Sequence, residues 1–223
     1  MRGRCLLSVL GLLVAVAAAQ AQPTSPVKAG VQAPATTPAP TSIEVHGAIP
    51  ESIVGTWLAI CNFKRADGHS LNKWHVYRFS RKDAAWHMEE LQGSAPPELD
   101  KPLTAAEGSG KPYMPDDAAI KAMGAALPRL AIRSEAEAWS RIIWRTSDNF
   151  PKDFPPQAEG AKLSIEFIDV PTPGMIASGG AFYVKDIAPT KLSGDSTASG
   201  VAKSGFVVVP IDISGPFTMF RLQ

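Results

Sequence analysis

Cysteine is scarce in this chain of 223 residues, which contains Cys5 and Cys61 and no other. Cys5 precedes an N-terminal apolar run that we expect to be removed, so Cys61 would remain alone and no intrachain disulfide could form. A lipid-anchored protein needs its cysteine directly after such a run, which disfavours lipid attachment at Cys5. Cys61 lies in an apolar stretch and is expected to be a small buried side chain rather than a catalytic thiolate. The folded protein must therefore rely on its hydrophobic core.

Hydrophobic runs long enough to span a membrane are absent too. The longest apolar run covers residues 6–19, about fourteen residues, whereas a spanning helix needs about twenty. Arg2 and Arg4 precede the run, and Ala19-Gln20-Ala21 follows with small residues at the two positions that a signal peptidase reads. We predict a signal peptide over residues 1–21, cleaved after Ala21 or alternatively after Ala19. The protein is then exported, periplasmic or secreted, with no membrane span after cleavage.

An excess of charge of either sign is also lacking. Without residues 1–21 the chain keeps 20 basic and 21 acidic side chains. The densest basic cluster is Lys64-Arg65 with Arg78, Arg81 and Lys82 nearby, and acidic residues are mixed into the segment after it. Nucleic-acid binding needs clustered cations that release counterions, so no nucleic-acid partner is expected.

Residues 22–42 contain no aromatic side chain and consist mainly of proline, alanine and threonine. Such a segment buries too little apolar surface to offset its loss of conformational entropy. We predict a disordered tether, or a featureless spacer, over residues 22–42, followed by a single β-rich domain over residues 43–223.

The pattern of the domain predicts a mostly β fold. Short apolar segments bounded by Gly, Pro, Asp or Ser are typical of strands, and they cover residues 52–63, 73–80, 84–91, 162–170, 175–187, 203–213 and 217–222. A hairpin is expected at residues 80–83. Residues 139–146 fit helix or strand, and Ile142-Ile143 between two tryptophans favours a strand. The count predicts an antiparallel barrel of roughly eight strands.

The middle of the chain interrupts this pattern. Pro115-Asp116-Asp117 is typical of a helix start, and Ser134 begins a second capping pattern, so we predict a helical insertion around residues 115–138. Residues 93–114 are rich in proline and glycine, which predicts a long loop.

Recognisable catalytic and metal-binding motifs are missing. Residues 108–111, GSGK, lack the upstream glycine of a phosphate loop and are predicted to form a turn. Residues 194–196, GDS, lie in a polar stretch that is typical of a hairpin loop, and the chain contains no G-x-S-x-G elbow. His75 and His87 lie on neighbouring predicted strands without further ligands. No catalytic residue, metal or cofactor is assigned, and enzymatic activity is left open but not favoured.

Aromatic residues are the remaining candidates for a site. Five tryptophans occur in the domain, and in a small barrel they line either the core or a ligand cavity. The candidate ligand-binding residues are Trp57, Trp74, Trp86, Phe167 and Tyr183.

The two ends of the domain resemble the lipocalin and wider calycin pattern. Gly55 and Trp57 match the G-x-W that opens the first barrel strand, and Arg221 matches the basic residue near the last strand that packs across that tryptophan. The T-D-Y motif of the family is missing, and a helical insertion at this position is unusual for it. The resemblance implies a barrel closed by contact between Trp57 and Arg221.

Two functions fit these features of the sequence. The first is an exported soluble β-barrel that binds a small apolar molecule. The alternative is a structural or protein-interaction module of the cell envelope with a filled core and no ligand. An empty or a filled interior distinguishes them.

Overall fold

The computed structural model describes residues 43–133, 139–169, 175–204 and 207–223, and within these ranges the chain forms one curled sheet of ten strands. The predicted signal peptide and tether lie outside the described residues. The strands are β1 (Glu44–His46), β2 (Gly55–Lys64), β3 (Ser70–Lys82), β4 (Ala85–Gln92), β5 (Ala131–Ile132), β6 (Trp139–Thr146), β7 (Leu163–Asp169), β8 (Met175–Ala188), β9 (Lys191–Ser204) and β10 (Val207–Arg221).

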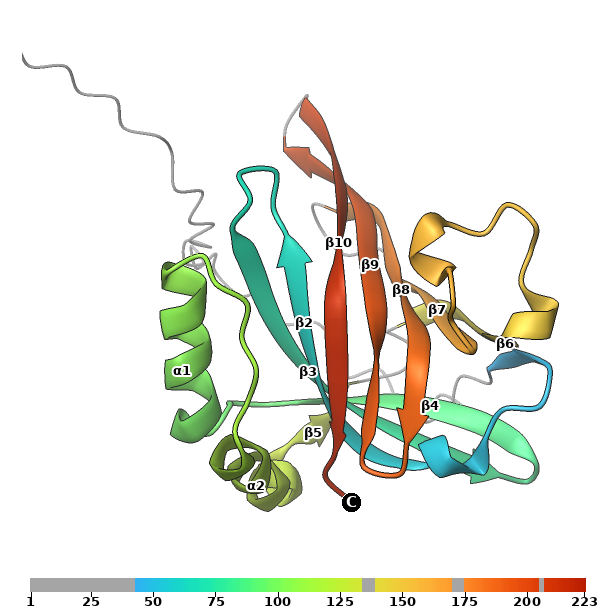
Figure 1. Ribbon diagram of the computed structural model, residues 1–223, viewed down its shortest axis with the longest axis horizontal. Helices are drawn as coiled ribbons and strands as arrows, with labels where there is room; N and C mark the ends of the chain where they lie inside the picture. Colours follow the sequence, from blue (N-terminus) through green and yellow to red (C-terminus); the bar gives the residue numbers. More distant parts are fainter. Residues whose placement is uncertain (1–42, 134–138, 170–174, 205–206) are drawn as a thin grey trace, which may run out of the picture. The chain divides into compact units, whose positions relative to one another are not determined.

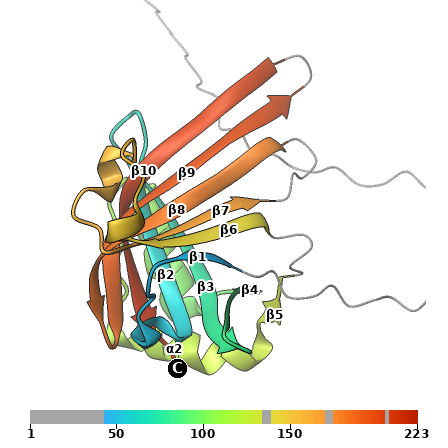
Figure 2. The same cartoon turned by 90° about the vertical axis from the view of Figure 1, so that its right-hand side faces the viewer.

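The strand order is β1-β6-β7-β8-β9-β10-β2-β3-β4-β5, and Figure 2 shows how the sheet curls into a half-barrel. The expectation of a mostly β, barrel-like fold is confirmed. The prediction of roughly eight purely antiparallel strands is not, because the described residues form ten strands and β1 pairs with β6 in parallel. The edge strands β1 and β5 contain three and two residues, too few to leave a pattern in the sequence.

A backbone hydrogen bond and an aromatic contact connect the β1–β6 side of the sheet to β4 near its other edge. Ile43 N donates to Trp86 O at 3.3 Å, linking the start of β1 to β4. The centre of the Trp86 ring lies 5.4 Å from that of the Trp144 ring on β6. Aromatic packing therefore holds β4 against β6 across the interior of the curl.

Strand β2 is buried on both faces. Trp57, Cys61 and Phe63 point into the curl, whereas Leu58 and Ile60 point outward into a second apolar cluster. Alternation along a strand produces this division. Double burial explains why residues 57–61 form a continuous apolar run instead of alternating with polar residues.

Two helices, α1 (Pro97–Gly108) and α2 (Asp117–Ala126), cover the outer face of this part of the sheet (Figure 1). The expected helix start at Asp116 is confirmed, since its carboxylate accepts from Ala119 N at 2.8 Å. The insertion predicted around residues 115–138 contains α2, a short 3-10 turn and β5, and its second capping pattern at residues 134–138 lies outside the described residues. In the part of the chain described, no helix is long and apolar enough to cross a membrane.

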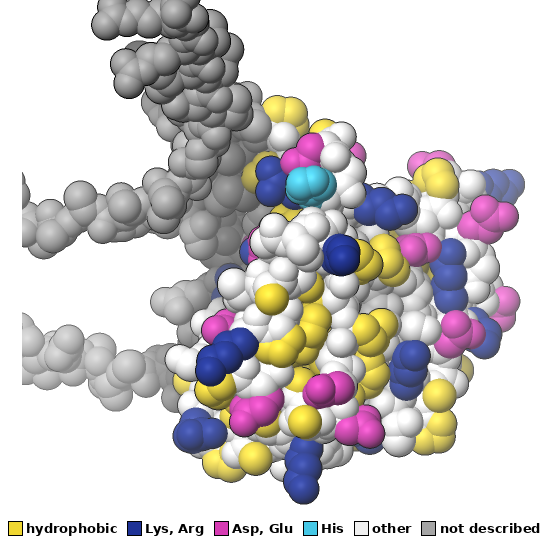
Figure 3. All heavy atoms as spheres, turned by 60° about the vertical axis from the view of Figure 1, so that its left-hand side comes forward, with side chains coloured by type: hydrophobic (Ala, Val, Ile, Leu, Met, Phe, Trp, Pro, Cys, Tyr) yellow, Lys and Arg dark blue, Asp and Glu magenta, His cyan; other side chains and the backbone are white. Residues whose placement is uncertain are grey.

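The prediction of a loop over residues 93–114 was wrong, because α1 occupies most of it. Pro97 stands at the start of the helix, where its missing N–H costs nothing, and Glu98 and Asp100 complement the helix dipole. Leu99 and Leu103, four residues apart, bury the same face. Figure 3 shows cationic and anionic side chains interspersed on the side of the molecule toward α1.

The strand alternative for residues 139–146 is confirmed, and so is the hairpin expected at residues 80–83, although its turn lies at residues 83–84. Residues 139–146 form β6. Lys82 pairs with Ala85, leaving Asp83 and Ala84 as a two-residue turn with positive φ angles of 50° and 64°. A turn with two left-handed residues matches the twist of the flanking strands.

The polar stretch of residues 192–200 lies within strand β9, so its prediction as a hairpin loop was wrong. The small side chains of this strand allow its backbone to lie close to that of β8. A Cβ at Gly194 would lie 2.0 Å from Tyr183 O on β8. Close approach of the backbones therefore requires glycine there, and composition alone could not separate this from a loop.

The corner where the last strand meets β2 is organised by Arg221. Its guanidinium lies 4.4 Å from the centre of the Trp57 ring, and the two residues are paired across β10 and β2. The predicted contact between Trp57 and Arg221 is therefore present. It joins strands in the middle of the sheet, however, and does not close the seam between the edges.

The same guanidinium donates to three backbone carbonyls, those of Ser52, Val54 and Pro189. Trp57 Nε1 donates to Ile53 O at 2.8 Å in the same segment. Gly55 has a φ of +143°, and a Cβ there would lie 2.6 Å from Arg221 Nη1. The glycine of the G-x-W pattern thus leaves room for the arginine that covers the tryptophan.

We predict energetic coupling between Trp57 and Arg221. Trp57→Ala should cost about 3–5 kcal/mol as a buried large aromatic. Arg221→Ala should cost about 2–4 kcal/mol, because charged hydrogen bonds are lost together with the ring contact. Denaturant unfolding of the two single variants and the double variant should give an interaction energy of at least about 0.5 kcal/mol. If the destabilisations of the two single variants simply add in the double variant, the contact is contradicted. Arg221→Lys, which keeps the positive charge but loses the guanidinium, serves as the control.

Candidate functional site

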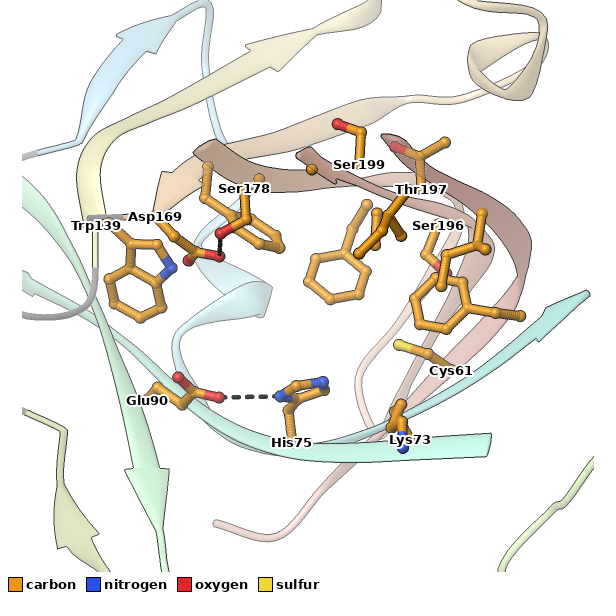
Figure 4. Close-up of a pocket in the computed structure, with 18 of the residues that line it drawn as sticks. Cys61, Lys73, His75, Glu90, Trp139, Asp169, Ser178, Ser196, Thr197 and Ser199 are labelled. Carbon is orange, nitrogen blue, oxygen red and sulfur yellow. Dashed lines mark hydrogen bonds and ion pairs between the residues drawn. The ribbon is translucent and has the colours of Figure 1, made fainter. Parts of the chain in front are cut away.

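A cavity of about 300 Å³ lies inside the curl, at the end of β2 away from Trp57. Five aromatic side chains from five strands line it, namely Phe63, Tyr77, Trp139, Phe167 and Phe182. Small residues of β9, including Ser196 and Ala198, form another part of the wall, and Figure 4 shows Ser196 there. The aromatic rings supply an apolar surface, and the small side chains leave the space unfilled.

Tyr77 marks the inner boundary of the cavity. Its ring lies 6.2 Å from Phe79 in a stacked arrangement and 5.7 Å from Phe182 edge-on. Burial raises the pKa of Tyr77 well above its ordinary value, and the charge of Glu90 adds to the shift, so the phenol stays neutral. Beyond this residue the interior is filled by Phe79, Trp86 and Trp144.

One wall of the cavity carries a polar cluster of three residues. His75 Nδ1 lies 2.9 Å from Glu90 Oε1, and Arg133 Nη1 lies 2.8 Å from Glu90 Oε2. His75 also stacks on Tyr77 at 5.6 Å with an angle of 12° between the rings. These contacts fix the imidazole at the cavity surface from two directions.

Glu90 is ionised in this cluster. Burial raises the pKa of the carboxyl, but the hydrogen bonds and charges of His75 and then Arg133 outweigh burial and hold it below its ordinary value. A carboxylate can only accept, so Nδ1 of His75 must donate its hydrogen. When the imidazole is neutral, Nε2 therefore carries the lone pair. The arrangement presents a fixed hydrogen-bond acceptor to the cavity.

Other polar groups surround this acceptor. Ser178 Oγ donates to Asp169 Oδ2 at 2.7 Å on the wall opposite His75, and Lys73 stands exposed at the rim. Burial raises the pKa of the Cys61 thiol to about 12. This confirms Cys61 as a buried apolar side chain, because a thiol with such a pKa is not a nucleophile at neutral pH.

The candidate ligand-binding residues lie in different places. Phe167 lines the cavity. Trp57 and Trp86 belong to the filled core beneath it. Trp74 packs under the helices on the outer face, and Tyr183 packs outside against Phe150 and Phe154. The structure thus gathers one of the five at the cavity and assigns the others to core or outer packing.

The ligand-binding candidates chosen from the sequence did not include Phe63, Tyr77, Trp139 or Phe182, and the whole polar cluster was missed. Glu90 and Arg133 are 43 positions apart and meet because β5 pairs with β4. The sequence did contain one sign of the polar cluster. His75, Tyr77 and Phe79 are spaced two residues apart and so share one strand face, which places a histidine among aromatic side chains.

The remaining sequence motifs do not assemble into a site. His87 pairs with Ser80 and faces away from His75, so the two histidines are apart. Across the described ranges no group of three His, Cys, Asp or Glu could hold a metal ion. Residues 108–111 form the turn at the end of α1, as expected.

Comparison of the chain with protein-family models, with curated proteins and with solved structures finds no match. The cavity and the residues around it are therefore the features from which a function can be inferred.

We predict that Glu90 stabilises the fold in a pH-dependent way. Its pKa is lower in the folded protein, so its contribution is fully present above the unfolded carboxyl pKa of about 4.3 and is lost as pH falls through the folded value. Glu90→Gln should cost about 1–3 kcal/mol at neutral pH, and the difference from wild type should shrink below about pH 4.

Denaturant unfolding from neutral to acidic pH measures this. The control is Glu89→Gln, which removes a more exposed pair with Arg78 and should cost less than about 1 kcal/mol. A wild type and a Glu90→Gln variant of equal stability at neutral pH would contradict the prediction.

Proposed function

We propose that this protein binds a small, mostly apolar molecule inside the half-barrel. The observation that carries the proposal is the unfilled cavity of about 300 Å³, lined by five aromatic side chains and one polar cluster. Ligand sites are typically concave, mostly apolar and equipped with a few placed polar groups. A volume of this order suits a molecule with one ring or a medium-length chain.

We also propose that the protein is exported and works as a lipocalin-like carrier. Arg2, Arg4 and the apolar run before Ala21 support export. The corner formed by Gly55, Trp57 and Arg221 supports the lipocalin-like part, because it has the contact that the resemblance implies. The parallel pair of β1 and β6 departs from that family's barrel.

A structural or protein-interaction module is the second candidate. The observation in its favour is that the interior around Trp57 and Trp144 is filled, since both side chains are completely buried. On this alternative the cavity is a packing defect without an occupant.

We predict that protein purified from its own host carries a bound molecule detectable by native mass spectrometry. Ala198→Phe places a ring in the cavity and should abolish the mass difference, because Ala198 lines the cavity and packs against the core. Val201→Phe introduces the same residue on the other face of the same strand and should leave the mass difference intact. A wild-type protein without any bound molecule supports the structural module instead.

We predict that the mature protein begins at Gln22, or at Gln20 if cleavage follows Ala19. N-terminal sequencing of the protein recovered from the exported fraction measures this. Retention of Met1, or lipid attached to a cysteine, contradicts the export proposal.

A further inference from the structure

We infer that the molecule held in this cavity is a weak acid, an apolar carboxylic acid that transfers its proton to His75 on binding. The inference rests on the proposed function and deepens it by naming the chemistry of the ligand's polar end. Its basis is the position of His75 between Glu90 and the cavity, together with the charges around it.

The orientation of the imidazole is fixed by its neighbours. Glu90 accepts from Nδ1 and Tyr77 stacks on the ring, so rotation about the side chain would break one contact or the other. Within the described ranges Nε2 has no protein partner, and Figure 4 shows it turned away from Glu90. A bound molecule that satisfies this acceptor must supply a hydrogen-bond donor.

The charges around the cavity are balanced. The charged groups facing His75 are Glu90 from β4, Arg133 after β5, Lys73 from its own strand and Asp169 at the end of β7. The neutral groups facing it are the Tyr77 phenol and the Cys61 thiol. Among the described residues that line the cavity, the cations Arg133 and Lys73 are matched by the anions Glu90 and Asp169. A ligand that adds no net charge avoids the cost of burying an uncompensated ion.

A carboxylic acid satisfies both requirements. Its O–H bond breaks, the proton forms a bond to Nε2 of His75, and the resulting carboxylate accepts a hydrogen bond from the same Nε2–H. The net charge of the cavity does not change. Glu90 stabilises the imidazolium through Nδ1, in the way a carboxylate stabilises the histidine of a catalytic triad. A hydrogen bond between ions is about twice as strong as one between neutral groups.

Other polar ends fit less well. An alcohol can donate to Nε2 but forms the weaker neutral hydrogen bond. An amine bound as a cation can donate to Nε2, but it brings an uncompensated positive charge next to Arg133.

The test compares three probes with one apolar body, 3-phenylpropionic acid, 3-phenylpropan-1-ol and 3-phenylpropylamine, by isothermal titration calorimetry on the full chain. We expect the acid to bind about tenfold or more tighter than the alcohol. At about pH 8 free carboxylic acids are ionised and model imidazoles neutral, so binding in buffers of different ionisation enthalpy should show uptake of about one proton. The affinity for the acid should fall about tenfold for each further pH unit.

His75→Gln should lose about tenfold or more in affinity for the acid, and it should lose the proton uptake. The control is His46→Gln, a surface histidine paired with Glu44 outside the cavity, which should change neither quantity. The wild-type comparison of acid with alcohol and the wild-type proton count need no variant, so they decide the question even if His75→Gln does not fold.

The outcomes separate this inference from the proposed function. Equal binding of acid and alcohol without proton uptake, still blocked by Ala198→Phe, overturns the weak-acid inference and leaves the binding function standing. Recovery from the host of a bound molecule without an acidic group also overturns the weak-acid inference and leaves the binding function standing. Absence of binding by all three probes, together with an unoccupied protein from the host, overturns both.

Discussion

The fold depends on the corner at which Arg221 covers Trp57. The last strand contacts the first long strand there, and one guanidinium ties together the segment before β2, the turn between β8 and β9 and the ring beneath it. A guanidinium suits this position because its several N–H groups can donate to backbone carbonyls that lie outside the strands and have no partner in the sheet. Gly55 completes the corner by leaving out the Cβ that would collide with the arginine.

With this corner fixed, the interior divides into a filled half and an unfilled half. Large rings pack around Trp57 and Trp144, where β2, β3 and β6 approach each other. Toward the other end the facing strand is β9, whose side chains are small, and the space opens into the cavity. Removing the charged side chains of the His75, Glu90 and Arg133 cluster from water costs free energy. Here each oxygen of Glu90 has a charged or polar partner, which offsets that cost.

The sequence predicted the parts of the fold that depend on local pattern. The β-rich character, the start of α2 at Asp116, the hairpin near Lys82 and the contact of Trp57 with Arg221 all depend on side chains near their partners or on a motif with fixed geometry. It missed α1, because the prolines and glycines around Leu99 mask the spacing of its apolar face. It also missed the polar cluster, because the meeting of Glu90 with Arg133 depends on a two-residue strand that leaves no periodic signal.

Strand β9, with the composition of a loop, forms a cavity wall and sets the volume of the interior by the side chains that it leaves out. Exchange of Ala198, which lines the cavity, for a larger residue would reduce the cavity volume without changing the His75 acceptor. On the proposed function, the polar end of a ligand and the size of its body are therefore recognised by separate strands. On that proposal, substitutions in β9 change the length of the molecule that fits, while β3 and β4 keep its chemistry constant.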